Sequence, residues 1–367
     1  MASPFRFGIV GCGVIAPTHI GAIGQIEGTE VVALADTLIE KARALGTKHG
    51  IDSLYSSCTE LLRNPAVDGV SICTPSGTHA DLAIEALRAG KHVIIEKPMD
   101  ISMEACDRLI RAADECKKVV AVISQHRFDA GTIAARDALH EGKPGRLVLA
   151  DASVKWYRTQ DYYDSGDWRG TWALDGGGAL MNQGVHTVDL LQWLAGNVKS
   201  VYALTRTAAH ERIEVEDLVV AALEFENGAI GTITASTACY PGHAVRLDLY
   251  GTEGSIVIEA DRLKSMHFKS GEKIEGEAAI EHALKVAQGG TSAVKDDTTA
   301  AAATASDPAA VWGDSHRAQI EDFLKAVHTG STPVVDAREG RKPVAVILAI
   351  YRSAKEGRRI DLSEMSE

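Results

Sequence analysis

Short apolar runs alternate with amphipathic segments over about the first third of this 367-residue chain. Continuous apolar runs predict strands buried on both faces, and apolar residues three or four apart predict helices. The predicted strands lie at residues 7–10, 31–35, 54, 69–74, 92–95 and 119–124, and helices are predicted after residue 16 and at 39–49, 59–63, 80–89 and 103–117. Such alternation predicts a parallel sheet covered by helices on both faces.

From about residue 146 onward, apolar and polar residues alternate with a period of two, which predicts strands with one buried face. These runs cover residues 147–158, 200–208, 218–226, 229–239, 245–250, 255–259 and 263–268, with helices predicted at 178–194, 315–328 and 341–355. Asn227-Gly228 predicts a hairpin turn. We therefore predict an α/β domain at residues 1–124 and an α+β domain at 125–367 with a large, mostly antiparallel sheet. Residues 298–310, rich in alanine and threonine, are predicted to form a surface excursion, with a short helix as the alternative.

The composition excludes several classes of protein. A net charge of -12 and a pI near 5.6 disfavour nucleic acid as a partner, since a phosphate backbone attracts positive charge. No run of 18 apolar residues and no signal peptide pattern is present, so we expect a cytoplasmic protein without a membrane partner. Its six cysteines show no C-x-x-C pair or zinc spacing, which predicts reduced thiols and no metal site.

The first predicted strand runs directly into Gly11-x-Gly13-x-x-Ala16. Gly11 permits a tight turn, Gly13 lets backbone N–H groups approach a pyrophosphate, and Ala16 lets the next helix pack closely on the sheet. This spacing is typical of a dinucleotide-binding turn, with the phosphates at the helix N-terminus.

The next predicted strand ends at Asp36, 20 residues beyond Ala16, where a carboxylate binds the ribose hydroxyls of such a cofactor. No basic residue follows Asp36 immediately, and a carboxylate repels a 2'-phosphate. We therefore predict NAD rather than NADP, although Lys41 and Arg43 leave some room for NADP.

Ligands of parallel sheets bind beyond the carboxyl ends of the strands. The residues at those places are Thr74-Pro75, Glu96-Lys97-Pro98 and Gln125-His126-Arg127, with His79 close behind the first group. Proline keeps the preceding residue extended, which fixes where the side chain of Lys97 emerges. We interpret Lys97 as a functional group near the nicotinamide end of the cofactor, rather than as an ordinary surface lysine.

Three glycines, Gly176 to Gly178, precede a predicted helix that carries Asn182 and His186. Glycines permit the close approach of a ligand, and residues four apart share a helical face. His186 is a candidate proton acceptor or donor near neutral pH, and Asp189 is a candidate to fix its tautomer. The alternative is a histidine satisfied within the core.

Aromatic residues gather between residues 156 and 172, together with Arg158 and Arg169. Flat rings stack on the C–H faces of sugars, and guanidinium groups bind hydroxyl, carboxylate or phosphate oxygens. This composition favours a carbohydrate ligand, with a hydrophobic lid or an oligomer contact as the alternative.

Four motifs together, Gly11 to Ala16, Thr74 to His79, Glu96 to Pro98 and Gly176 to Asp189, resemble the Gfo/Idh/MocA family of sugar and cyclitol dehydrogenases. The resemblance covers nearly the whole chain. It implies a Rossmann domain followed by an antiparallel sheet domain, NAD or NADP as cofactor, a substrate held between the domains, and homodimers or homotetramers paired through the open face of the sheet.

The resemblance also implies roles for single residues. Lys97 would bind the reacting hydroxyl and favour its alkoxide, and His186 would accept its proton. Many members carry aspartate where this chain has Asn182, so no two-residue proton relay is expected. The expected cofactor contacts are Gly11, Gly13, Val14, Ile15, Ala16, Asp36, Thr74, Pro75, His79, Glu96, Lys97 and Gln125. The expected substrate contacts are Lys97, Arg127, Tyr163, Trp168, Arg169, Trp172, Asn182 and His186.

The leading hypothesis is therefore an NAD-dependent dehydrogenase that oxidises a secondary ring hydroxyl of a sugar, such as the 3-hydroxyl of a glucoside or nucleotide sugar. Two alternatives keep the same fold: a glycosidase that oxidises its substrate transiently with bound NAD, and a non-catalytic NAD-sensing regulator. The joint presence of Lys97 and His186 disfavours the regulator, which needs neither residue.

Overall fold

The computed structural model describes residues 3–276, 278–279, 281 and 313–365. The chain divides into two compact units, Met1–Ser124 with Val311–Arg341, and Gln125–Ala310 with Lys342–Glu367. The first unit thus includes a C-terminal segment that the sequence analysis placed in the second domain. The surface excursion predicted at residues 298–310 lies outside the described residues.

The first unit contains a six-stranded sheet in the order β3-β2-β1-β4-β5-β6, with every neighbouring pair parallel. This is the doubly wound order of a Rossmann domain, as predicted. Its strands are β1 (Phe5–Val10), β2 (Thr29–Ala35), β3 (Ser53–Tyr55), β4 (Gly69–Ile72), β5 (His92–Ile95) and β6 (Val120–Val122). Its helices are α1 (Ala16–Gly24), α2 (Ile39–His49), α3 (Cys58–Leu62), α4 (His79–Arg88), α5 (Met103–Cys116) and α11 (Gly313–Thr329), with a 3-10 turn η1 (Ser76–Thr78).

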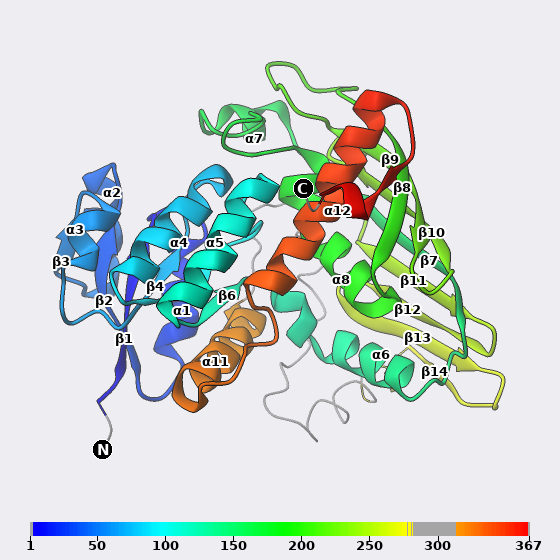
Figure 1. Ribbon diagram of the computed structural model, residues 1–367, viewed down its shortest axis with the longest axis horizontal. Helices are drawn as coiled ribbons and strands as arrows, with labels where there is room; N and C mark the ends of the chain where they lie inside the picture. The colour runs from blue at the N-terminus through cyan, green and yellow to red at the C-terminus, as the bar shows by residue number, and fades with distance from the viewer. Residues whose placement is uncertain (1–2, 277, 280, 282–312, 366–367) are drawn as a thin grey trace. The chain divides into compact units, whose positions relative to one another are not determined.

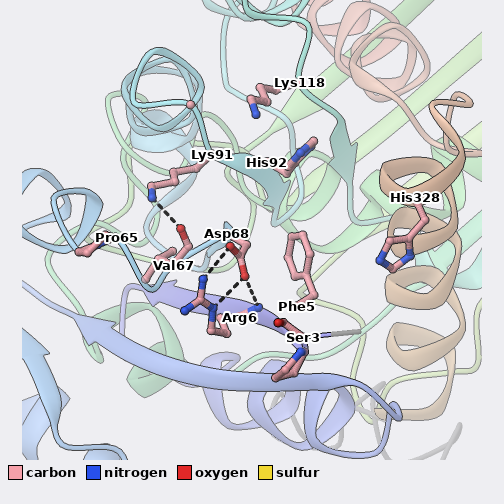
Figure 2. Close-up of a pocket in the computed structure, with 12 residues that line it drawn as sticks. Ser3, Phe5, Arg6, Pro65, Val67, Asp68, Lys91, His92, Lys118 and His328 are labelled. Atoms are coloured by element: carbon pink, nitrogen blue, oxygen red, sulfur yellow. Dashed lines mark hydrogen bonds and ion pairs between the residues drawn. The ribbon is translucent and has the colours of Figure 1, made fainter. Parts of the chain in front are cut away.

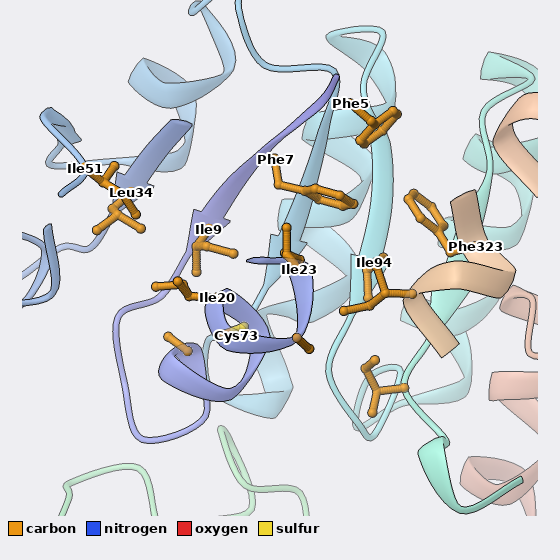
Figure 3. Packing of buried hydrophobic residues seen from close by; sticks show 14 of the residues in the cluster. Phe5, Phe7, Ile9, Ile20, Ile23, Leu34, Ile51, Cys73, Ile94 and Phe323 are labelled. Carbon is orange, nitrogen blue, oxygen red and sulfur yellow. The ribbon is translucent and has the colours of Figure 1, made fainter. Parts of the chain in front are cut away.

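Helix α11 completes the hydrophobic core of the first unit, although it lies far along the chain. Phe323 packs against Phe5 and Phe7 of β1, with its ring centroid 6.1 Å from each of theirs (Figure 3). Ile320 and Leu324 join the same buried cluster. The next helix, α12 (Ala337–Glu356), begins in the first unit and ends in the second.

A shallow cavity of about 480 Å³ lies at the amino ends of the strands of the first unit (Figure 2). Phe5, Arg6, Asp68 and His92 line it, and Arg6 forms an ion pair with Asp68 at 3.0 Å. Ligands of doubly wound sheets bind at the opposite, carboxyl ends. The cavity is therefore not the cofactor site.

The second unit is built on a nine-stranded sheet in the order β14-β13-β12-β11-β7-β10-β9-β8-β15. Only β7 and β10 pair in parallel; the other neighbours are antiparallel. The strands are β7 (Leu147–Lys155), β8 (Val198–Arg206), β9 (Leu218–Phe225), β10 (Ile230–Ser236), β11 (Arg246–Gly251), β12 (Gly254–Glu259), β13 (Arg262–Phe268), β14 (Lys273–Glu275) and β15 (Ile360–Asp361). The mostly antiparallel second sheet is thus confirmed.

Helices pack on one face of this sheet. They include α6 (Ala130–His140) and α8 (Val185–Ala195), which lie beside β11 to β13 and β7 (Figure 1). Further helical segments include η2 (Gln125–Phe128), α7 (Gln160–Asp164), the π-helical η3 (Ala179–Gly184) and η4 (Leu362–Met365). Helix α6 was not predicted, because its many alanines give little contrast between apolar and polar faces.

Considering only the residues that the structure describes, the opposite face of the nine-stranded sheet is open within the second unit. Alternate positions of β8 to β10 are exposed, and several of them are large and apolar: Tyr202, Leu204, Val220 and Ile230, with Tyr250 on β11. Their partners in each strand point into the core, as the period of two requires.

The described part of the chain was compared with what a membrane span and a disulfide require. None of its helices combines the length and the apolarity that crossing a bilayer demands. All six cysteines fall within it, and all six are free thiols.

Candidate functional site

Strand register places four predicted site segments at one edge of the first sheet. Val10 pairs with both Ala35 and Ile72, and Ile72 pairs with Ile95. The residues that follow these strands, beginning with Gly11, Asp36, Cys73 and Glu96, therefore lie side by side at the carboxyl edge.

The turn after β1 depends on glycine at position 11. Gly11 has a φ of +91°, and a Cβ there would lie 2.6 Å from the carbonyl oxygen of Cys73. Gly13 is different, because a Cβ at that position would meet no atom of the described residues within 4 Å. Gly11 is thus required by the chain itself, whereas the absent side chain of Gly13 leaves space for a ligand.

Asp36 binds the same turn. Its Oδ2 accepts a hydrogen bond from the backbone N–H of Cys12 at 2.8 Å, and its Oδ1 accepts one from Leu38 at 2.8 Å. Carboxylate oxygens have further lone pairs for ribose hydroxyls. The nearby Arg43 forms an ion pair with Glu40 at 2.5 Å, so it is engaged with a carboxylate.

These features fit NAD. The N-terminus of α1 begins at Ala16 beside the open space at Gly13, and Val14 next to it is exposed. Backbone N–H groups at a helix N-terminus bind phosphate, and the Asp36 carboxylate suits unphosphorylated ribose.

His79 is buried beneath the end of β4. Its Nε2 lies 2.8 Å from the carbonyl oxygen of Thr74, and its Nδ1 lies 2.7 Å from that of Pro98. The imidazole therefore connects two of the predicted site segments. This geometry supports a structural role for His79. Thr74 and Pro75, which follow β4 at the carboxyl edge of the sheet, stay predicted cofactor contacts.

Glu96 and Lys97 follow β5, with a cis peptide bond between Lys97 and Pro98. The Glu96 side chain is 6% exposed and turns inward to His19, whose Nε2 lies 2.8 Å from Glu96 Oε1. Its other oxygen accepts the backbone N–H of Lys97 at 3.1 Å. The Lys97 side chain is half-buried.

Gln125 opens the second unit and is buried. Its Oε1 has no hydrogen-bond partner among the described residues, while its Nε2 lies 3.3 Å from His126 Nε2. A buried oxygen without a partner is costly unless a ligand or water binds it. The predicted cofactor contact of Gln125 stays a prediction that this geometry supports.

The glycine-led segment differs from the single α-helix that we predicted. It forms a π-helix, Ala179–Gly184, and becomes α-helical only from Val185. Asn182 and His186 therefore do not have the simple spacing of one α-helical turn. A Cβ at Gly178 would lie 2.0 Å from the carbonyl oxygen of Glu216, so close packing explains this glycine.

A buried carboxyl group holds the start of the π-helix. Glu216 accepts hydrogen bonds from the N–H groups of Gly178 at 2.9 Å and Leu180 at 2.8 Å, and from the hydroxyl of Tyr351 at 2.9 Å. Burial raises the pKa of Glu216 to about 7, against the lowering effect of these bonds.

The amide of Asn182 is fixed by its neighbours. Its Nδ2 donates a short hydrogen bond to Asp175, and its Oδ1 accepts one from Gln183 at 3.0 Å. Asp175 also accepts the backbone N–H of Gly170 at 2.8 Å. Asn182 is therefore held in one orientation.

His186 is half-buried at the start of α8. One turn on, Asp189 forms a bidentate ion pair with Arg127, with contacts of 2.8 and 2.6 Å. Arg127 is 2% exposed and also lies over the ring of Trp193. This arrangement supports a structural role for Arg127, joining η2 to α8.

Part of the predicted aromatic cluster forms a connected polar group. Arg169 lies over the rings of Tyr162 and Trp168, and its Nη1 donates to the Tyr162 hydroxyl at 2.7 Å. Gln183 also donates to that hydroxyl, at 2.8 Å, and accepts from Arg158 at 3.0 Å. We name Arg158, Tyr162, Trp168, Arg169 and Gln183 the arginine–aromatic group.

The other two predicted aromatic contacts are not members of this group, although the ring of Tyr163 packs edge to face on that of Tyr162, with centroids 5.2 Å apart. Tyr163 is buried, with its hydroxyl 2.7 Å from Thr237 Oγ1, so its geometry supports packing. Trp172 is 45% exposed and packs edge to face on Tyr351.

Several residues in these networks were not singled out from the sequence, chiefly His19, Asp175, Glu216 and His316. His19, Glu216 and His316 lie far along the chain from the residues that they contact. Asp175 contacts residues close to it in sequence, Gly170 and Asn182, and it directly precedes the glycines that were singled out.

Two family profiles match most of the chain. Residues 5–124 match the oxidoreductase family with the NAD-binding Rossmann fold, and residues 132–257 match the GFO/IDH/MocA C-terminal domain.

Known proteins are similar over long stretches. The WlbA dehydrogenase from Bordetella pertussis, solved in complex with NADH and UDP-GlcNAcA, is 34% identical with a TM-score of 0.86, over 98% of each chain. The 1,5-anhydro-D-fructose reductase of Ensifer adhaerens is 32% identical over 69% of this chain and 75% of its own. The myo-inositol 2-dehydrogenase of Thermotoga maritima is 23% identical over 98% of this chain and 99% of its own. The chain therefore belongs to the Gfo/Idh/MocA family, as an NAD-dependent oxidoreductase of the sugar and cyclitol dehydrogenase type.

Proposed function

We propose that this enzyme oxidises a secondary ring hydroxyl of a UDP-linked sugar with NAD, and that the 3-hydroxyl of a sugar bearing a carboxylate is the preferred target. The observation that carries the proposal is the 34% identity, over 98% of both chains, with a dehydrogenase solved with NADH and UDP-GlcNAcA. Relatives that act on free cyclitols are more distant, as the 23% identity of the inositol dehydrogenase illustrates.

The first unit supplies the cofactor half of the proposal. NAD, when bound, accepts the hydride from the carbon that is oxidised. The chain holds it through the turn at Gly11 and Gly13, the N-terminus of α1 and the carboxylate of Asp36. We propose that Lys97 donates to the reacting hydroxyl and stabilises its alkoxide, as an ammonium at a developing negative charge does.

The second unit supplies the proton acceptor. His186 would take the hydroxyl proton, the usual work of a half-buried imidazole near neutral pH. Asn182 cannot accept a proton, and Asp175 and Gln183 already fix its amide. Its proposed role is therefore to hold a substrate hydroxyl in one orientation.

The arginine–aromatic group suits the remainder of such a substrate. The half-buried ring of Trp168 offers a face for a sugar, and the half-buried guanidinium group of Arg169 matches carboxylate or phosphate oxygens. A neutral cyclitol would leave the charge of Arg169 without an anionic partner from the ligand.

We also propose that the open sheet face pairs with a second copy of the chain, giving a homodimer or homotetramer. Leu204, Val220 and Ile230 are 55%, 47% and 60% exposed on adjacent strands. Such a row of large apolar side chains is typical of surfaces that bind another protein.

The test is to incubate the purified enzyme with NAD and one candidate at a time, and to follow NADH formation. UDP-GlcNAcA, UDP-GlcNAc, levoglucosan and myo-inositol are the informative set. We expect kcat/KM to be at least about tenfold higher for UDP-GlcNAcA than for UDP-GlcNAc, since the latter lacks the carboxylate and one lost charged contact costs about 1.4 kcal/mol or more. A preference for myo-inositol would overturn the proposed substrate class, and an aglycone released without NADH would favour the glycosidase alternative.

A further inference from the structure

A buried cluster of two histidines and a carboxylate lies next to Lys97 and belongs to no part of the reaction described above. His19 on α1, Glu96 after β5 and His316 on α11 are 0%, 6% and 1% exposed. The Nε2 atoms of His19 and His316 lie 2.8 and 3.7 Å from the same oxygen, Glu96 Oε1. All three residues belong to the first unit.

One assignment of protons satisfies the hydrogen bonds around His19. If the Ser71 hydroxyl donates to His19 Nδ1 at 2.8 Å, the ring carries its proton on Nε2 and donates it to Glu96 Oε1. The Cys73 thiol, 3.8 Å from Ser71 Oγ, then donates to that hydroxyl. The chain of donors ends at Glu96, which accepts Lys97 N–H on its second oxygen.

The charges agree with this assignment. Burial lowers the pKa of His19, which keeps the imidazole neutral. Burial would raise the pKa of Glu96, but the hydrogen bond from His19 and the nearby imidazole of His316 hold it well below its usual value. Burial also raises the pKa of Cys73 far above its usual value, so the thiol keeps its proton. Glu96 is thus a buried carboxylate stabilised by N–H donors.

The same three residues have ligand atoms within 4.8 Å of one another, which is compatible with a metal ion. The geometry favours protons instead. Two ligands at about 2.0–2.1 Å from a tetrahedral zinc ion are roughly 3.3 Å apart. The 2.8 Å separation of His19 Nε2 and Glu96 Oε1 is that of a charge-assisted hydrogen bond.

The main chain at Lys97 is held on both sides. Glu96 binds its N–H, and His79 lies 2.7 Å from the carbonyl oxygen of the next residue, Pro98. The direction in which the Lys97 side chain leaves the backbone therefore depends on Glu96 staying where His19 and His316 place it.

We propose that His19 and His316 are positioning residues, which act through Glu96 to aim the ammonium group of Lys97 at its substrate hydroxyl. The proposal rests on the proposed function, in which Lys97 stabilises the alkoxide. The cluster transfers no proton during turnover; it fixes geometry. Misplacement of a catalytic group by about 1 Å costs on the order of 100-fold in rate.

The test compares His19→Leu with His19→Gln. Leucine has a similar volume and no donor, whereas the glutamine amide can place an N–H near the position of Nε2. We expect kcat to fall at least about tenfold in His19→Leu and to recover largely in His19→Gln, with KM for NAD nearly unchanged because Asp36 and Gly11 are untouched. Equal impairment of both variants, or normal kcat in both, would overturn the proposal.

Further variants and measurements keep the test decisive. If His19→Leu does not fold, His316→Leu and His316→Gln give the same contrast with a longer, weaker contact. The reactivity of the Lys97 amine toward an acylating reagent, read by mass spectrometry without substrate, should change several-fold in the leucine variants alone.

Lys97→Ala tests the proposed function separately: normal turnover there would refute the role of Lys97, whereas unchanged amine reactivity in the leucine variants would refute the positioning. Stoichiometric zinc in the purified protein would also contradict it.

Discussion

The imidazole rings of His126 and His186 meet edge to face, with their centroids 5.2 Å apart and their planes at 85°. His126 Nδ1 lies 2.7 Å from Asp129 Oδ2 and 3.8 Å from Asp261 Oδ1. Burial lowers the pKa of His126, but Asp261 and Asp129 outweigh it and raise the pKa to about 9. The proposed proton acceptor therefore has a positively charged neighbour at neutral pH.

The contacts of His126 with Asp129 and Asp261 predict that the stability of the protein depends on pH. Because the pKa of His126 rises from 6.5 in the unfolded chain to about 9 on folding, its protonated form contributes stability that is fully present below pH 6.5 and lost as the pH rises through about 9. We expect the melting temperature to fall between pH 6.5 and 9.5, and to fall less in His126→Gln. His140→Gln, on α6, is the control and should keep the wild-type profile. Parallel profiles for wild type and His126→Gln would contradict this assignment.

Two glycines of the cofactor turn should respond differently to substitution. Gly13→Val adds a side chain in open space, so the melting temperature without NAD should change little, while the Kd for NAD rises at least about tenfold, or 1.4 kcal/mol. Gly11→Ala should lower the melting temperature itself, because its Cβ would meet Cys73 at a positive φ. Calorimetric titration and thermal melts of both variants make the comparison. Unchanged NAD affinity in Gly13→Val would place the pyrophosphate elsewhere.

Removal of the proposed catalytic groups should abolish turnover but spare cofactor binding. Lys97→Ala and His186→Ala are each expected to reduce kcat on the order of 10²–10⁴-fold, the usual contribution of a positioned acid or base. Lys91→Ala is the matched control, since that lysine donates to the carbonyl oxygen of Val67 at 2.6 Å, at the other end of the sheet. Stopped-flow kinetics and NAD titrations measure both effects. Near-normal kcat in either variant would remove that residue from the mechanism.

The open sheet face predicts an effect of charge on assembly. Leu204→Lys with Val220→Lys places two positive charges on neighbouring strands, at positions paired directly across β8 and β9. We expect the double variant to be smaller in solution than the wild type by light scattering, with its far-ultraviolet circular dichroism unchanged. Lys199→Arg with Glu226→Lys, at two exposed polar positions, changes the net charge by the same amount and serves as the control. A wild-type monomer would refute the pairing.

The fold was largely predictable because it depends on local patterns. Period-two and continuous apolar runs located nearly all the strands, and the Gly11 turn with Asp36 predicted the Rossmann domain, which the family profile confirms. Short elements such as β15 and the alanine-rich α6 gave too little contrast between faces to be recognised.

The networks that orient the candidate residues were not predictable in the same way. Glu216 binds Gly178 and Tyr351 across separations that no periodicity encodes. Glu96 turns inward to His19 on α1, and α11 adds His316 from the far end of the chain. Sequence reasoning proposed the groups that would carry the chemistry, since their types and motifs are local. It did not single out the residues that orient them, since any buried donor or acceptor at the right place suffices.

The packing of Phe323 against Phe5 and Phe7 bears on how the protein is made. A ribosome has to synthesise most of the chain before α11 emerges. Until then, one side of the hydrophobic core of the nascent nucleotide-binding unit is exposed to solvent. We expect a fragment ending at residue 124 to aggregate when expressed alone, and one carrying residues 313–341 on a linker to stay in solution.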